Sequence, residues 1–175
     1  GFRKRGDVVF LLGESSRNLE GSEYLAYLFQ IEGGLPPEPD LEVERKIQDA
    51  CLQAIRRKFA VSCHDCSDGG LAVALSECCM AGGMGAEITL SDLDPETLFS
   101  EAPSRILLTA PPEYAETVIA LFQERNVPFS RIGVTAGDSL VLASRGTRIS
   151  IPVAALEEAS RSGLISALEG TADAT

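Results

Sequence analysis

The chain has 175 residues, and 45% of them are hydrophobic, which is enough for one ordinary domain with a buried core. Its 15 Lys and Arg against 26 Asp and Glu give a net charge of −11, so its overall field repels nucleic acid and anionic membranes. No stretch reaches the roughly 20 apolar residues of a membrane-spanning helix, and the N-terminus has no apolar signal core. We therefore predict a cytoplasmic protein with no nucleic-acid or membrane partner.

The chain has an odd number of cysteines, and four of the five lie in or beside apolar runs. This usage is typical of free thiols in a reducing compartment rather than of a disulfide framework. The chain also begins directly before an apolar strand, from which we expect a piece of a longer protein.

Short apolar runs bounded by glycine or proline predict strands, and apolar positions that recur every three or four residues predict helices. In chain order, the predicted elements are a strand at 8–12, helices at 22–30 and 40–58, a strand at 60–63, a helix at 71–80, a strand at 86–90, a short helix from 94, a strand at 104–109, a helix at 113–126, strands at 129–134, 140–143 and 147–151, and a helix from 152 to about 161. The helix at 71–80 is apolar nearly all round, so we expect it to be buried.

Strands that alternate with helices predict a mixed sheet covered by helices. The predicted fold class is therefore α/β, a layered α/β/α sandwich with a mixed sheet. We predict a single domain over residues 1–170 and a frayed tail over 171–175.

The loop after the second predicted strand reads S-C-H-D-C-S-D-G-G over residues 62–70. Its C-H-D-C stretch supplies zinc ligand types, but the only further pair of neighbouring thiols is Cys78 and Cys79, whose adjacent helical side chains point about 100° apart. A redox role for Cys63 and Cys66 is also weighed, and the neighbouring carboxylates argue against a reactive thiolate because they raise thiol pKa values.

A phosphate site is another interpretation of the same loop. A strand that ends near His64, a Ser-Asp-Gly-Gly turn over 67–70 and a helix would place free backbone N–H groups at a tight turn. Asp65 and Asp68 are suited to magnesium. The alternative is a structural turn, in which Asp68 caps the helix and the two glycines allow the helix to pack closely on the sheet. From the residues alone, both interpretations stay open.

Several stretches are similar, in order, to the C-terminal domain of the phosphoribosylformylglycinamidine synthase family. They are H-D-C-S-D-G-G-L-A-V-A-L at 64–75, G-S-E-Y-L at 21–25, G-A-E-I at 85–88, L-F-S-E-A-P-S-R at 98–105 and R-I-G-V-T-A-G-D at 131–138. The resemblance spans roughly residues 6–169. It also extends to the wider superfamily of aminoimidazole ribonucleotide (AIR) synthetase.

The resemblance implies an AIR synthase C-terminal-domain-like fold, partly like a ferredoxin fold. It implies an ATP-dependent ligase of purine biosynthesis that uses ATP or ADP and magnesium, with N-terminal half-barrel domains in the same chain and a glutaminase subunit or domain that supplies ammonia. It further implies that this second α/β domain is mainly structural or binds an auxiliary nucleotide, so that it holds no catalytic residue and is inactive alone.

The candidate nucleotide, phosphate or pseudo-site residues that follow are His64, Asp65, Ser67, Asp68, Gly69, Gly70, Glu101, Ser104 and Arg105, with Asp65 and Asp68 as candidate magnesium ligands. For Arg105, the alternative is a surface ion pair with no chemical role. Asp92 and Asp94 are considered as contributors to a metal site, but a helix start is the favoured interpretation of these two residues. A sister ATP-using enzyme of the superfamily and a free-standing binding module remain alternative functions. If the half-barrel domains are missing, the surface that would contact them is exposed, and we expect this surface to promote self-association.

Overall fold

The structure is a computed structural model that describes residues 1–14, 17–35 and 37–170. Its elements are β1 (Val8–Leu12), α1 (Glu23–Phe29), α2 (Leu41–Arg56), β2 (Ser62–Asp65), α3 (Gly70–Gly82), β3 (Ala86–Thr89), α4 (Pro95–Phe99), β4 (Ile106–Ala110), the 3-10 helix η1 (Pro112–Tyr114), α5 (Ala115–Glu124), β5 (Phe129–Thr135), β6 (Ser139–Ser144), β7 (Thr147–Pro152) and α6 (Val153–Gly170). The predicted order of strands and helices is confirmed. The predicted tail at 171–175 lies outside the described residues.

The strands form one seven-stranded mixed sheet in the order β2-β4-β1-β5-β3-β6-β7. Only the pairing of β3 with β6 is parallel among the described strands, and the other neighbours are antiparallel. The first strand of the chain lies inside the sheet, where Val8 pairs with Ala110 of β4 and with Val134 of β5. Strand β2, which leads into the Gly-Gly loop, forms one edge.

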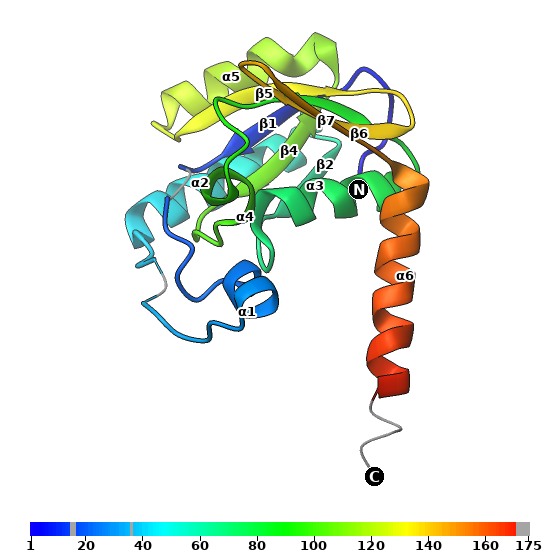
Figure 1. Ribbon diagram of the computed structural model, residues 1–175. Helices are drawn as coiled ribbons and strands as arrows, with labels where there is room; N and C mark the ends of the chain where they lie inside the picture. The colour runs from blue at the N-terminus through cyan, green and yellow to red at the C-terminus, as the bar shows by residue number, and fades with distance from the viewer. Residues whose placement is uncertain (15–16, 36, 171–175) are drawn as a thin grey trace.

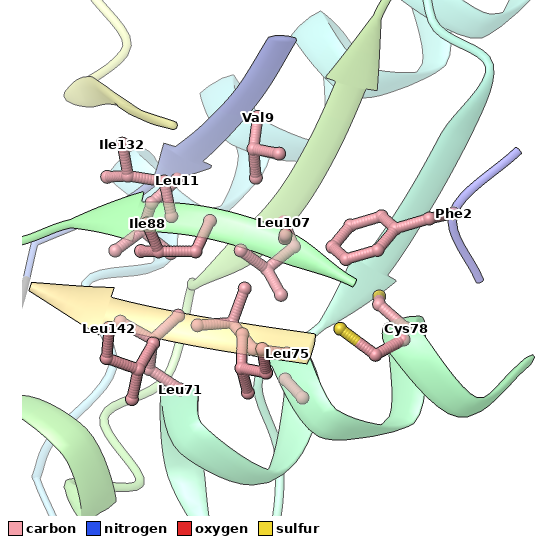
Figure 2. Packing of buried hydrophobic residues seen from close by; sticks show 14 of the residues in the cluster. Phe2, Val9, Leu11, Leu71, Leu75, Cys78, Ile88, Leu107, Ile132 and Leu142 are labelled. Carbon is pink, nitrogen blue, oxygen red and sulfur yellow. The ribbon is translucent and has the colours of Figure 1, made fainter. Parts of the chain in front are cut away.

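Helices cover both faces of the sheet, and each face has its own apolar core (Figure 1). Val9 and Leu11 of β1 point to the face covered by α3, where they join the cluster that Figure 2 shows around Leu71 and Leu75. Phe10 points to the opposite face and meets Phe122 of α5 edge-on, with ring centroids 6.1 Å apart. Because β1 is buried on both faces, it reads as a continuous apolar run. The predicted α/β/α sandwich is confirmed.

Two boundaries and the burial of one helix differ from the prediction. Strand β2 lies two residues further along than expected, so that His64 and Asp65 belong to the strand, while Val61 is exposed. Helix α3 buries one face only, and Val73 is 37% exposed on the other. Helix α6 continues to Gly170 instead of ending near 161, and Figure 1 shows it extending beyond the body of the domain.

The helix starts follow local side-chain chemistry. Ser22, Asp40 and Asp94 each accept a hydrogen bond from a backbone N–H of the helix that follows, as N-cap residues do. Strands β6 and β7 form the hairpin predicted around Arg145 and Gly146. None of the helices in the described part of the chain is both long and apolar enough to cross a membrane.

Asp7, just before β1, gives a prediction about pH. Its side chain is 2% exposed, and burial raises the pKa of its carboxyl. Because the folded chain binds this proton more tightly than the unfolded chain, the carboxyl favours folding at acid pH, and this contribution is lost as pH rises through the folded pKa. Asp7→Asn should therefore raise the free energy of unfolding at pH 7, measured by urea denaturation, and the gain should disappear near pH 3.

Asp138→Asn is the control for this experiment. The Asp138 carboxyl is 85% exposed in its ion pair with Arg5, so its removal should change stability little at either pH. A loss of stability at pH 7 in Asp7→Asn would show that the charged carboxylate is well accommodated.

Candidate functional site: the loop before α3

The loop between β2 and α3 ends in two glycines with left-handed backbone conformations. Gly69 has φ 76° and is the N-cap of α3, and Gly70 has φ 64°. A Cβ on Gly70 would lie 2.5 Å from the backbone oxygen of Ser100. Gly70 therefore lets the first turn of α3 lie against the segment that joins α4 to β4, whereas the structural interpretation expected both glycines to allow close packing on the sheet.

A carboxylate of the chain itself binds the start of α3. Glu101 Oε1 accepts hydrogen bonds from the backbone N–H groups of Gly69 and Glu23, each at 2.8 Å. The N-terminus of a helix favours a negative charge, and Glu101 supplies it where one of the two open interpretations placed a phosphate. Asp68 does not take the capping role that the structural interpretation gave it, because α3 has no side-chain cap and the Asp68 side chain is exposed.

Arg105 is buried directly under this turn. Its side chain is 2% exposed, and its Nη1 donates to the backbone oxygen of Ser100 at 2.9 Å, the same oxygen that Gly70 approaches. Within the described residues, Nε and Nη2 have no hydrogen-bond partner and the guanidinium has no ion pair. Burial lowers the pKa of this guanidinium. The surface ion pair considered from the sequence is therefore not formed.

Two serine hydroxyls nearby share this lack of partners. Ser100 Oγ and Ser104 Oγ are buried and make no hydrogen bond to any residue that the structure describes. Ser104 also has an unusual φ of 62° for a residue other than glycine. Residues 100–105 thus gather hydroxyl and guanidinium groups whose hydrogen-bonding capacity is unused, which suits an anion more than a cation.

Ser104 also lines a cleft of about 510 Å³. Glu14, Glu38 and Asp40 lie on the walls of the same cleft. The acidic walls would repel a phosphate there, so the cleft itself is a poor anion site.

His64 and Asp65 are held by local contacts. His64 Nε2 lies 3.2 Å from Glu77 Oε2 of α3, and His64 Nδ1 lies 2.8 Å from the backbone oxygen of Asp65. The hydroxyl of Ser67 donates to the Asp65 carboxylate, which lowers the pKa of that carboxyl. Asp65 and Asp68 are both exposed. Over the described ranges, no group of three or more His, Cys, Asp or Glu side chains is placed to hold a metal ion.

The cysteines carry no disulfide among themselves and are all free thiols. Burial raises the pKa of Cys66 to about 12, of Cys78 to about 11 and of Cys79 to about 12. The Cys51 thiol hydrogen bonds to Cys63, which raises the pKa of Cys51 and lowers that of Cys63. Cys63 is also less buried than the other four thiols, so we expect it to react first.

Thiol titration tests this ranking and the zinc or redox alternative together. At pH 8, a disulfide reagent should modify Cys63 first, while Cys66, Cys78 and Cys79 should react only after denaturation. Peptide mapping would identify the modified residues, and elemental analysis of the same sample would measure zinc. Rapid modification of Cys66 in the native protein, or one zinc per chain, would support the alternative.

The structure therefore places the sequence-predicted residues in separate environments. Gly69, Gly70 and Glu101 meet at the start of α3, with Arg105 buried beneath them. His64 contacts α3 further along, and Ser104 faces the acidic cleft. Ser100 is the residue that sequence reasoning missed, because no local pattern in the sequence distinguishes a buried serine hydroxyl without a partner from an exposed one.

The sequence of this chain matches a known protein-family model over most of its length. Residues 4–145 match the model described as "AIR synthase related protein, C-terminal domain", and the chain belongs to this family.

Among curated relatives, the chain is 47% identical over 148 residues to "Phosphoribosylformylglycinamidine synthase subunit PurL" of Moorella thermoacetica, covering 83% of the chain and 20% of that protein. The PurL subunit of Thermobifida fusca is 40% identical over 90% of the chain and 20% of its own length. The chain thus spans about a fifth of these relatives.

Solved structures show the same fold at lower sequence identity. The Thermotoga maritima PurL complexed with FGAR superposes with a TM-score of 0.76 at 18% identity, covering 88% of this chain and 28% of that one. The same protein complexed with ATP gives a TM-score of 0.70 at 19% identity, covering 89% of this chain and 26% of that one. The predicted resemblance is confirmed by the family match and the curated relatives.

Proposed function

We propose that this chain is a domain of the ATP-dependent ligase that converts formylglycinamide ribonucleotide to formylglycinamidine ribonucleotide in purine biosynthesis. The observation that carries the proposal is the 47% identity, over 83% of the chain, to a relative named as a subunit of phosphoribosylformylglycinamidine synthase. In this proposal, half-barrel domains of the same polypeptide and a glutaminase that supplies ammonia complete the enzyme. The five free thiols agree with a cytoplasmic location.

Within that enzyme, we assign this domain a structural or auxiliary nucleotide-binding role. Its helix N-terminus is already bound by Glu101, and His64 is engaged with Glu77, so neither is free to act on a substrate. The groups that fit a nucleotide phosphate are the unpaired nitrogens of Arg105 and the hydroxyls of Ser100 and Ser104. Because each of these atoms is buried, a phosphate would reach them only if the segment at 100–105 moved.

Magnesium and ATP fit this loop only in part. When bound with a nucleotide, magnesium supplies positive charge that offsets the phosphates. Asp65 and Asp68 are the exposed carboxylates that would hold the ion, and Ser67 already positions Asp65 by a hydrogen bond. Because Glu101 occupies the Gly69 amide, a phosphate would bind on the Arg105 side of the turn or displace this carboxylate.

The proposed activity is tested on the native-length protein that contains this segment. With ammonia as nitrogen donor, ADP release should depend on added formylglycinamide ribonucleotide. ADP release that is absent, or equal without this substrate, would contradict the ligase assignment. It would favour a sister ATP-using enzyme or a binding module.

The non-catalytic role of His64 gives a separate prediction. In the native-length protein, His64→Ala should weaken nucleotide retention or stability while kcat stays within about tenfold. Loss of a catalytic acid or base would lower kcat by about 10²- to 10⁴-fold. The measurements are kcat for ADP release and nucleotide content after gel filtration. Glu77→Gln is the matched control, because it removes only the partner of His64. A folded His64→Ala variant with kcat lowered more than about 10³-fold would contradict this role.

A further inference from the structure

Helix α1 exposes an apolar surface that the domain does not cover. None of its residues is buried, and Figure 1 shows it standing clear of the sheet and its covering helices. We use the name α1 patch for the exposed apolar side chains of α1 and of the segment that follows it, which are Tyr27 (80% exposed), Leu28 (57%), Phe29 (56%), Ile31 (53%) and Leu35 (80%). These five large apolar side chains are all exposed within nine residues of sequence, and exposed apolar surface of this kind marks a candidate interaction surface.

The helix is nonetheless anchored at its first turn. Ser22 is 2% exposed, and its hydroxyl donates to the Leu19 carbonyl at 2.6 Å. Tyr24 stacks on Phe99 of α4, with ring centroids 4.8 Å apart, and the Glu23 N–H is bound by Glu101. An isolated helix of this length would be unstable in water, so these contacts determine where it stands.

The segment after α1 is also braced. Gly21 donates its N–H to the Gly33 oxygen at 3.1 Å, and Leu35 donates its N–H to Glu20 Oε2 at 3.0 Å. These bonds tie the two ends of the segment together across the base of α1. The α1 patch is therefore presented in a fixed geometry, and a partner would not have to order it on binding.

We propose that another domain of the same, longer polypeptide docks on the α1 patch. This inference rests on the proposed function, in which the chain is one domain of a synthetase subunit. Its support is the length of the relatives, of which the chain spans only 20–22%. Most of such a polypeptide is available to cover the patch.

Charge argues against a second copy of this chain as the occupant. Between residues 18 and 44 the sequence contains no Lys or Arg, and Glu20, Glu23 and Glu32 flank the patch. A symmetric dimer brings the same surface of both copies together, which would set these carboxylates against one another. The docked surface is therefore apolar at its centre and carries Lys or Arg at its rim.

Hydroxyl-radical footprinting of the native-length protein tests the proposal. Tyr27 is 80% exposed in this domain and Tyr114 is 40% exposed, so an uncovered domain would label Tyr27 faster. Docking predicts the reverse order, with Tyr27 labelled far more slowly than in the urea-unfolded protein. Labelling of Tyr27 near its unfolded rate would overturn the proposal. Protection that disappears on dilution would overturn it as well, because it would identify a second copy as the occupant.

A variant pair strengthens the test. Tyr27→Ser should weaken docking by about thirtyfold, as expected for loss of a buried aromatic anchor, and should expose Phe29 and Leu35 to labelling. Ile55→Ser is the control, because Ile55 is also an exposed apolar residue, at 49%, but lies on α2, outside the α1 patch. Equal labelling of Phe29 and Leu35 in both variants would overturn the proposal.

Substrate-dependent ADP release is measured on the same preparation. An active ligase with a readily labelled Tyr27 would overturn the docking alone. A protected Tyr27 without such ADP release would overturn the proposed function and leave the docking in place.

Discussion

Alanine at position 70 should destabilise the domain far more than alanine at position 83. Both glycines have left-handed backbones, with φ 64° and 60°, so both substitutions carry a similar conformational cost of about 1 kcal/mol. At Gly70 the new Cβ would also lie 2.5 Å from Ser100 O, whereas at Gly83 nothing lies within 4 Å. The overlap with backbone should add about 1–3 kcal/mol to the cost of Gly70→Ala.

Urea denaturation of the two variants measures the difference directly. The comparison isolates the close approach between α3 and residues 99–100, because the matched φ values cancel the backbone term. Equal midpoints for Gly70→Ala and Gly83→Ala would show that the 99–100 segment yields without cost. In that case the Gly-Gly pair would not be needed for packing, and a direct role in binding would gain support.

Replacing Arg105 with methionine should stabilise the domain and weaken anion binding at the same time. A buried guanidinium with one hydrogen bond and no ion pair bears a large desolvation cost. Methionine is uncharged and shorter than arginine, so it removes the desolvation cost but leaves a small cavity. We expect the removal of the desolvation cost to prevail, with a gain of about 1–4 kcal/mol in the free energy of unfolding. If Arg105 serves to bind a nucleotide phosphate, the native-length variant should retain less nucleotide after gel filtration.

Arg131→Met is the control for this exchange, because Arg131 is exposed on β5. An exposed site away from special contacts should change stability by no more than about 0.5 kcal/mol. Arg105→Met would contradict our account if it lowered the urea midpoint by a wide margin. Such a loss would mean that the guanidinium stabilises the fold itself.

Local patterns in the sequence predicted the fold well because they act over a few residues. The apolar run at 8–12 and the side chains of Ser22, Asp40 and Asp94 identify a strand and three helix starts without any tertiary information. The misplaced second strand shows where this fails. Ala60 and Val61 are apolar, but β2 begins at Ser62 because its register is fixed by pairing with β4.

The candidate site could be predicted only in its local part. The Gly-Gly turn can be predicted from adjacent residues, whereas the hydrogen bonds that hold the loop join residues that are far apart in the sequence. Glu101 reaches Gly69 and Glu23 across 32 and 78 residues, and no periodicity signals such a contact. The burial of Arg105 was equally hidden, because an arginine in a polar-looking segment is ordinarily exposed.

The interior position of the first strand has a consequence for how the chain acquires its structure. The partners of Val8 are Ala110 and Val134, so neither edge of β1 can be satisfied until most of the domain has been synthesised. Contacts of such long sequence separation slow folding. On the ribosome, the run Val8–Leu12 would emerge early and wait as an unpaired apolar segment, open to aggregation or to chaperones.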